Sequence, residues 1–269
     1  MSESLPTPPP LPIAPPQLPV EVAHAAVIDP PEAPLSAVRW PIPLLIGLVV
    51  LNLAFVYFSS LLVGRAGIMD AFTQDGAVIV LTAVIMLQYL PALIVALWWA
   101  RSHGATFADT FSFRGFNVLP GIGIAVGLSL AGRGFGMWYV SATRMLGIDA
   151  PTTPDVTHLF PLTAVGIAAT VLVAVIIAPI AEEALFRGVL FAGLRDRLGF
   201  VSGMIISAAI FAGVHFSLYQ FAPLFMLGLM LAYLVTKTRS IWPSIVCHAM
   251  FNGVAVGLLY VLRAIGVGS

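Results

Sequence analysis

Long apolar runs dominate this sequence, and they restrict the chain to a membrane more than any other feature does. A helix that crosses a bilayer needs about 20 mostly apolar residues. We expect seven membrane-spanning helices, at 41–64, 77–100, 117–140, 162–194, 200–219, 222–236 and 241–262. The span 222–236 is the weakest because it is short, whereas 162–194 is too long, so 170–194 is its expected spanning part. The predicted fold is an all-α, polytopic membrane helical bundle.

Composition supports this class and excludes others. Hydrophobic residues make up 59% of the chain and charged residues 9%, whereas a soluble domain is about 25% charged. The formal net charge is zero, with 12 basic and 12 acidic residues. Because the sequence has no basic stripe, nucleic acid is not an expected partner. The lipid bilayer is the first partner that the sequence predicts.

The chain divides into three parts. Residues 1–38 hold 11 of the 21 prolines, so we expect a disordered or polyproline II tail there. Residues 39–160 are expected to form N-terminal transmembrane helices, and 161–269 a membrane core that carries most of the polar groups.

Basic residues in the connections predict the orientation. If the N-terminus is cytoplasmic, the connections on that side carry seven basic residues, Arg39, Arg101, Arg114, Arg195, Arg197, Lys237 and Arg239. The other side carries three, Arg65, Arg144 and Arg263. Because cytoplasmic loops are enriched in Lys and Arg, we expect a cytoplasmic N-terminus and a C-terminus on the opposite side.

Polar groups recur at helical spacing in three of the C-terminal apolar segments. They are Glu182, Glu183 and Arg187; His215 after Phe211; and His248 with Asn252. Ionisable groups at membrane depth are costly and usually functional. Counted from the same end of the bundle, Glu182, His215 and Asn252 lie at about 18, 22 and 16 Å. This similar depth predicts a catalytic pocket between the C-terminal helices.

Helical spacing gives these residues different chemical roles. Residues four apart share a face, so Glu183 should pair with Arg187, whereas Glu182 lies over Phe186 and is free to act as a general base. Phe211 should restrict the His215 ring.

His248 and Asn252 could together bind a developing oxyanion, while Glu182 and His215 polarise a water. The set can hydrolyse an amide bond, although a single membrane His or Asn more often makes an interhelical hydrogen bond.

Two further residues have less specific meanings. Cys247 is a single cysteine, which excludes an internal disulfide or a thiolate metal cluster, and we expect it to be a small buried residue. Arg133 could pair with an active-site carboxylate, bind a substrate carboxylate or snorkel to the membrane surface. Around it, Gly123/Gly127 and Gly132/Gly136 are spaced like small-residue packing faces.

The three polar sets resemble the motifs of the CPBP family, which includes the CAAX prenyl endopeptidases and bacterial Abi proteins. Glu182-Glu183-Ala184-Leu185-Phe186-Arg187 is similar to EExxxR, Phe211 to His215 to FxxxH, and His248 to Asn252 to HxxxN. The resemblance covers about 160–262. It implies an intramembrane endopeptidase in which Glu182 and His215 activate water, His248 and Asn252 form the oxyanion site, and Glu183 and Arg187 support them.

The resemblance also bears on the substrate and location. It implies a membrane-associated peptide or protein substrate, of CAAX type or otherwise lipidated, and a bacterial cytoplasmic membrane. Some members of the family are linked to bacteriocin maturation, self-immunity or partner anchoring.

Three alternatives remain open. No cofactor is expected, but Glu182, His215 and His248 also resemble a two-histidine, one-carboxylate zinc set. The chain could instead be a non-enzymatic membrane protein for bacteriocin self-immunity or partner anchoring. A transporter is disfavoured because the polar residues gather in one half of the chain.

Overall fold

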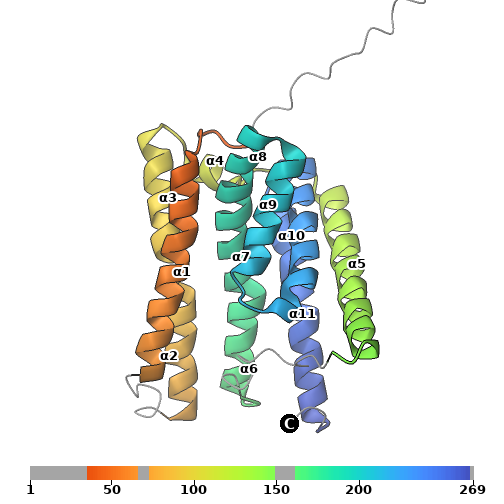
Figure 1. The fold of residues 1–269 in the computed structure, drawn as a ribbon. Helices are drawn as coiled ribbons and strands as arrows, with labels where there is room; N and C mark the ends of the chain where they lie inside the picture. Colours follow the sequence, from red (N-terminus) through yellow and green to blue (C-terminus); the bar gives the residue numbers. More distant parts are fainter. Residues whose placement is uncertain (1–34, 66–72, 149–160, 267–269) are drawn as a thin grey trace, which may run out of the picture. The chain divides into compact units, whose positions relative to one another are not determined.

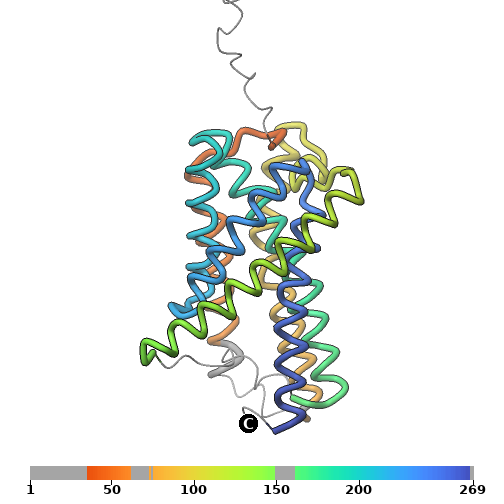
Figure 2. Tube along the Cα trace, turned by 90° about the vertical axis from the view of Figure 1, so that its right-hand side faces the viewer, coloured from red at the N-terminus to blue at the C-terminus, as the bar shows by residue number. Residues whose placement is uncertain are grey.

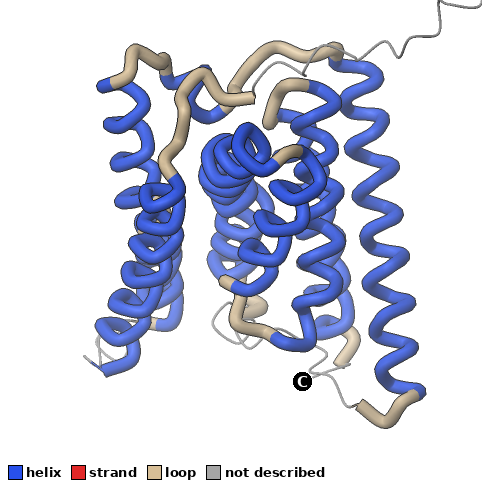
Figure 3. The backbone as a smooth tube through the Cα atoms, turned by 45° about the horizontal axis from the view of Figure 1, so that its top comes forward, coloured by secondary structure: helices blue, strands red, loops and turns tan. Residues whose placement is uncertain are grey.

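The computed structural model describes residues 35–65, 73–148 and 161–266, and the regular elements in these ranges are helices (Figure 3). The N-terminal helices are α1 (Ile42–Arg65), α2 (Gln74–Leu87), α3 (Leu90–Ser102), α4 (Phe107–Phe111) and α5 (Val118–Met145). A long helical run follows, made of α6 (Ala164–Thr170), η4 (Val171–Ile177), α7 (Ala178–Glu182), η5 (Glu183–Phe191) and α8 (Ala192–Leu198). The last helices are α9 (Phe200–Gly213), α10 (Leu218–Thr238) and α11 (Trp242–Ala264).

Within the described residues, six helical runs are long and apolar enough to cross a membrane. They are Ile42–Leu61, Asp75–Ser102, Val118–Met145, Ala164–Leu198, Leu218–Thr238 and Trp242–Ala264. The chain is therefore an integral membrane protein, and the predicted all-α bundle is confirmed.

The short member of the bundle is not the one that the sequence predicted. The expected weak span 222–236 is part of α10, which has 21 residues, whereas α9 has 14 and ends at Gly213. At 1.5 Å per residue, α9 is about 21 Å long. The turn between α9 and α10 lies above the lower ends of α6 and α11 in both views (Figures 1 and 2). The expectation for 200–219 was wrong because the helix ends well before residue 219.

The fourth span is one long helical run with two π-helical segments. It extends from Ala164 to Leu198, and the proline at 179 lies inside it. The run stays helical over 35 residues, and the expectation that 170–194 is the part inside the bilayer stays a prediction. The π-helical segments η4 and η5 flank α7. Such segments are rare in proteins overall, but those that occur are often found at functional sites.

The helices are arranged with α1, α2 and α3 on one side and α5 on the other, and the C-terminal helices lie between them (Figure 1). Helix α5 packs on α10 and α11. Its buried residues are all small or of medium size, namely Gly121, Ala125, Ser129, Gly132 and Thr143.

The predicted small-residue pairs of α5 were mostly placed on the wrong face. A Cβ atom added at Gly123, Gly127 or Gly136 would meet nothing within 4 Å. Gly132 does pack, against Phe251 and Met230.

Basic connections meet at one end of the bundle. Arg197 Nε donates to the carbonyl oxygen of Trp40 at 2.6 Å, and Ser240 donates to that of Arg114 at 2.6 Å. These contacts join the start of α1 to α8 and the end of α10 to the segment before α5. The C-terminal end of α11 lies at the opposite end (Figure 1).

The predicted tail 1–38 falls mostly outside the described residues. Its last four residues do not fit the expectation of disorder, because Leu35, Ser36 and Val38 are buried. The backbone amides of Leu35 and Ser36 donate to the Asp196 carboxylate at 3.3 and 3.4 Å. Side-chain and backbone contacts with α8 thus fix this segment.

Candidate active site

A buried ionic cluster lies where η5 faces α11. Glu183 is 0% exposed, and its Oε1 atom is 3.2 Å from Arg187 Nη1 and 3.0 Å from His248 Nδ1. The predicted pair of Glu183 and Arg187 is therefore present. The contact with His248 was not predicted, and it fixes the ring so that Nε2 points away from Glu183.

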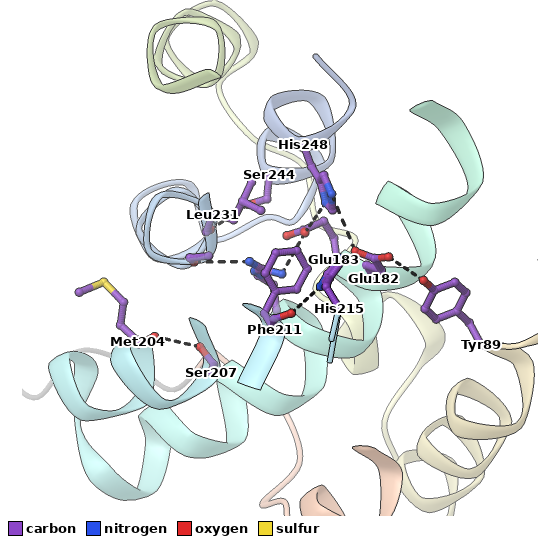
Figure 4. A network of polar contacts seen from close by, with 12 residues as sticks. Tyr89, Glu182, Glu183, Met204, Ser207, Phe211, His215, Leu231, Ser244 and His248 are labelled. Carbon is purple, nitrogen blue, oxygen red and sulfur yellow. Dashed lines mark hydrogen bonds and ion pairs between the residues drawn. The ribbon is translucent and has the colours of Figure 1, made fainter. Parts of the chain in front are cut away.

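The neighbouring carboxylate has a different environment. Glu182 ends α7, and its Oε1 atom accepts a hydrogen bond of 2.6 Å from the Tyr89 hydroxyl. Its Oε2 atom is buried, 3.8 Å from His248 Nε2, and has no hydrogen-bond partner among the described residues. A separation of 3.8 Å is too long for a hydrogen bond. Glu182 Oε2 and His248 Nε2 are thus each able to bind another group. Figure 4 shows the two side chains facing each other.

Phe211 packs against both His215 and His248. Its ring centroid is 5.0 Å from that of His215 and 5.7 Å from that of His248. The Arg187 guanidinium carbon lies 4.2 Å from the same centroid. The predicted contact between Phe211 and His215 is confirmed, and Phe211 also contacts His248 of α11 and Arg187 of η5.

His215 lies just beyond the end of α9 and is exposed. Its Nδ1 atom is 2.7 Å from the carbonyl oxygen of Phe211. Because a carbonyl only accepts hydrogen bonds, Nδ1 must carry the proton in this contact. In the neutral ring, Nε2 is then left as the proton acceptor.

Asn252 contacts the backbone of the long helical run. Its Nδ2 donates to the carbonyl oxygen of Ala174 at 2.9 Å. In η4 the amide of Ala178 donates to Val173, and Pro179, which is five residues after Ala174, has no N–H to donate. Asn252 therefore supplies a donor to a carbonyl that the widened helix leaves without one.

Cys247 and Arg133 lie outside the three polar motifs. Cys247 is buried, as predicted. The Arg133 guanidinium carbon lies 3.5 Å from the centroid of the Phe251 ring. No acidic partner of Arg133 occurs in the part of the chain that the structure describes.

Tyr89 was not predicted as a site residue. It is 8% exposed and lies between α2 and α3, far from the motifs in the sequence. A tyrosine beside Gln88 and Pro91 in an apolar run was the available signal. Spacing could not assign it, because its partner Glu182 is on another helix.

A zinc site needs three or four ligand side chains close together. Across residues 35–65, 73–148 and 161–266, no group of three or more His, Cys, Asp or Glu side chains is arranged to hold a metal ion. Metal-free activation of water stays a prediction.

Comparison with known proteins supports the motif resemblance. Residues 164–254 match the family model described as "Type II CAAX prenyl endopeptidase Rce1-like". This stretch is similar to that family. It contains Glu182, His215, His248 and Asn252 and ends ten residues before the end of α11.

A curated relative is also similar. The Bacillus subtilis (strain 168) protein named "Putative membrane peptidase YdiL" is 34% identical over 82 residues, which is 30% of this chain. The match spans 34% of the length of that relative. No solved structure matches the chain.

Proposed function

We propose that this chain is an intramembrane endopeptidase that uses a glutamate-activated water and no metal. The observation that carries the proposal is the buried Oε2 atom of Glu182, which lies 3.8 Å from His248 Nε2 and accepts no hydrogen bond from the described residues. A buried carboxylate oxygen without a donor is costly, and a bound water would supply one. The Rce1-like match over residues 164–254 supports the same assignment.

In the proposed reaction, Glu182 is the general base. Oε2 takes a proton from water as the water oxygen attacks the carbonyl carbon of the substrate. The same carboxyl then gives the proton to the leaving amine nitrogen as the C–N bond breaks. The products are a new carboxyl terminus and a free amine.

His248 is assigned to the oxyanion. Its Nδ1 contacts Glu183, whose charge is balanced by Arg187, so that Nε2 points toward the reacting centre. When the ring is protonated, Nε2–H can donate to the developing negative charge on the substrate oxygen. Glu183 and Arg187 hold this ring in place and do not touch the substrate.

His215 and Asn252 complete the site. With Nδ1 bonded to Phe211, His215 presents Nε2 to water. The turn of residues 214–217 supports a wet approach, since non-helical backbone at membrane depth is tolerated beside protein or water. Asn252 has a second amide hydrogen for the oxyanion, while its bond to Ala174 holds the side chain.

The substrate is assigned by similarity. The description of the matched family suggests a lipidated, CAAX-type segment, and YdiL is named as a membrane peptidase. We propose a membrane-associated peptide or protein of that kind. We also propose the bacterial cytoplasmic membrane as its location, with the N-terminal, basic end of the bundle in the cytoplasm.

The test uses the full chain in liposomes and a quenched-fluorescence peptide with a farnesylated cysteine in a CAAX sequence. We expect the wild type to cleave it, and Glu182→Ala and His215→Ala to lose at least about a thousandfold in rate while keeping their thermal unfolding temperature. In parallel, peptides that accumulate in cells with the wild type and with Glu182→Ala would identify other substrates. If the cellular effect of the protein survives both substitutions, the chain acts by binding, as an immunity or anchoring protein would.

A further inference from the structure

The N-terminal helices contribute one group directly to the Glu182 carboxylate. The Tyr89 hydroxyl donates to Oε1 at 2.6 Å, and the ring is buried. Figure 4 shows Tyr89 reaching Glu182 from the side opposite His248. Tyr89 lies outside the Rce1-like stretch 164–254, so the family match does not assign it a role.

Tyr89 lies at a short interruption between α2 and α3, where the backbone keeps helical dihedral angles. The α2 helix ends at Leu87 and α3 begins at Leu90, with a proline at 91. Pro91 has no N–H for the helical ladder and so favours a break just before it. Gln88 and Tyr89 form the turn, and the phenol projects from the turn to Glu182.

Helix α1 contacts the backbone of this interruption through Asn52. Asn52 is 4% exposed, and its Nδ2 donates to the carbonyl oxygen of Gln88 at 3.3 Å. A buried amide in an otherwise apolar span needs such a partner. The contacts thus run from Asn52 in α1, through the Gln88–Tyr89 turn, to Glu182.

We propose that Tyr89 is a positioning residue for Glu182, and that Asn52 supports it through the turn. This inference rests on the proposed function of Glu182 as general base. The phenol occupies Oε1, which turns Oε2 toward His248 and leaves it as the oxygen that receives the proton of water. The same bond favours the charged carboxylate, since a donor to an anion stabilises it.

The first experiment compares Tyr89→Phe with Tyr57→Phe in the liposome assay. Tyr57 is a matched control because it lies in α1 and is 65% exposed. We expect Tyr89→Phe to lower kcat by about tenfold, the loss of one hydrogen bond to a charged group, with little change in KM. We also expect the acid limb of its rate profile to move to higher pH. Tyr57→Phe should match the wild type.

The pH shift can be assigned because the substitution changes one group. The other ionisable groups of the site, which the variant retains, are Glu183, Arg187, His215 and His248. A purely structural role for Tyr89 would lower the unfolding temperature or the amount of active protein without moving the pH profile.

A second measurement does not depend on cleavage. Dicyclohexylcarbodiimide modifies protonated carboxyl groups in membranes, and mass spectrometry can locate the adduct on Glu182. We expect labelling to extend to higher pH in Tyr89→Phe than in the wild type and in Tyr57→Phe. The outcome is readable even if no substrate is cleaved, so failure of the proposed function is distinguishable from failure of this inference.

Asn52→Leu provides an independent variant. Loss of the bond to Gln88 should move the labelling and the rate profile in the same direction as Tyr89→Phe, by a smaller amount. If Tyr89→Phe keeps the wild-type kcat, acid limb and labelling profile, Tyr89 does not position Glu182 and the inference is wrong.

Discussion

The two halves of the bundle handle buried polar groups in different ways. In the C-terminal half, Glu183 is within 3.2 Å of both Arg187 and His248. Among the described residues of the N-terminal half, the buried polar side chains are uncharged Ser, Thr and Asn, and the half-buried Arg133 packs on an aromatic ring. Burial separates the halves less clearly: the most apolar parts of the N-terminal spans are 17–28% buried, against 22–39% for the C-terminal spans.

Arg187 and Arg133, one in each half, have similar aromatic contacts but different ionic surroundings. Both guanidinium groups stack on a phenylalanine, Arg187 on Phe211 and Arg133 on Phe251. Stacking is therefore common to the two halves, whereas the ionic network occurs in one of them. A charge that neighbours balance can be kept fully inside the protein, and this is the condition that a fixed catalytic carboxylate requires.

Exchange of each arginine for methionine tests this difference most strongly. Arg187→Met leaves the Glu183 carboxylate buried without its guanidinium, so we expect a loss of about 3–5 kcal/mol in unfolding free energy. Arg133→Met removes no counter-charge, and its lost stacking is offset by relief from burying a charge, so the change should stay below about 1 kcal/mol. Reversible unfolding in mixed detergent micelles, followed by helical circular dichroism, measures both.

The double substitution Glu183→Gln with Arg187→Met is the control for the first arginine. It removes both charges together, and we expect it to recover part of the lost stability. Equal losses for Arg187→Met and Arg133→Met would show that stacking, and not the ionic network, stabilises the C-terminal half.

Glycine substitutions compare packing in the two halves. A Cβ atom at Gly188 in η5 would lie 2.8 Å from the Phe111 Cα atom, whereas at Gly123 in α5 it would meet nothing within 4 Å. Gly188→Ala should destabilise the protein by about 1–3 kcal/mol, since backbone must shift. Gly123→Ala should be neutral or stabilise by up to about 1 kcal/mol through helix propensity. Unfolding in detergent would decide, and a neutral Gly188→Ala would contradict the close approach of η5 to α4.

Metal removal should have the smallest effect. If the C-terminal network activates water without a metal, treatment with a zinc chelator leaves the cleavage rate of the farnesylated peptide unchanged. The rate is measured before and after dialysis with the chelator, and again after zinc is added back. Loss of cleavage that zinc restores would favour the alternative in which Glu182, His215 and His248 bind the metal.

The sequence by itself determined the membrane class and the contacts within single helices. Apolar runs of spanning length have no soluble alternative. The pair of Glu183 with Arg187 and the packing of Phe211 on His215 follow from a spacing of four residues, because local backbone geometry makes such residues neighbours whatever the rest of the fold does. Local spacing also separated Glu182 from Glu183, since one of them had a cation within reach.

The tertiary structure decided which faces of the helices meet. Tyr89 reaches Glu182, His248 lies between two carboxylates, and Asn252 contacts Ala174, all across different helices. In lipid every face of a helix can be apolar, so hydrophobic patterning does not fix the rotation of one helix against another. The break before Pro91 and the π-helical segments also change the register. These contacts therefore depend on packing and on backbone irregularities that spacing along one helix does not encode.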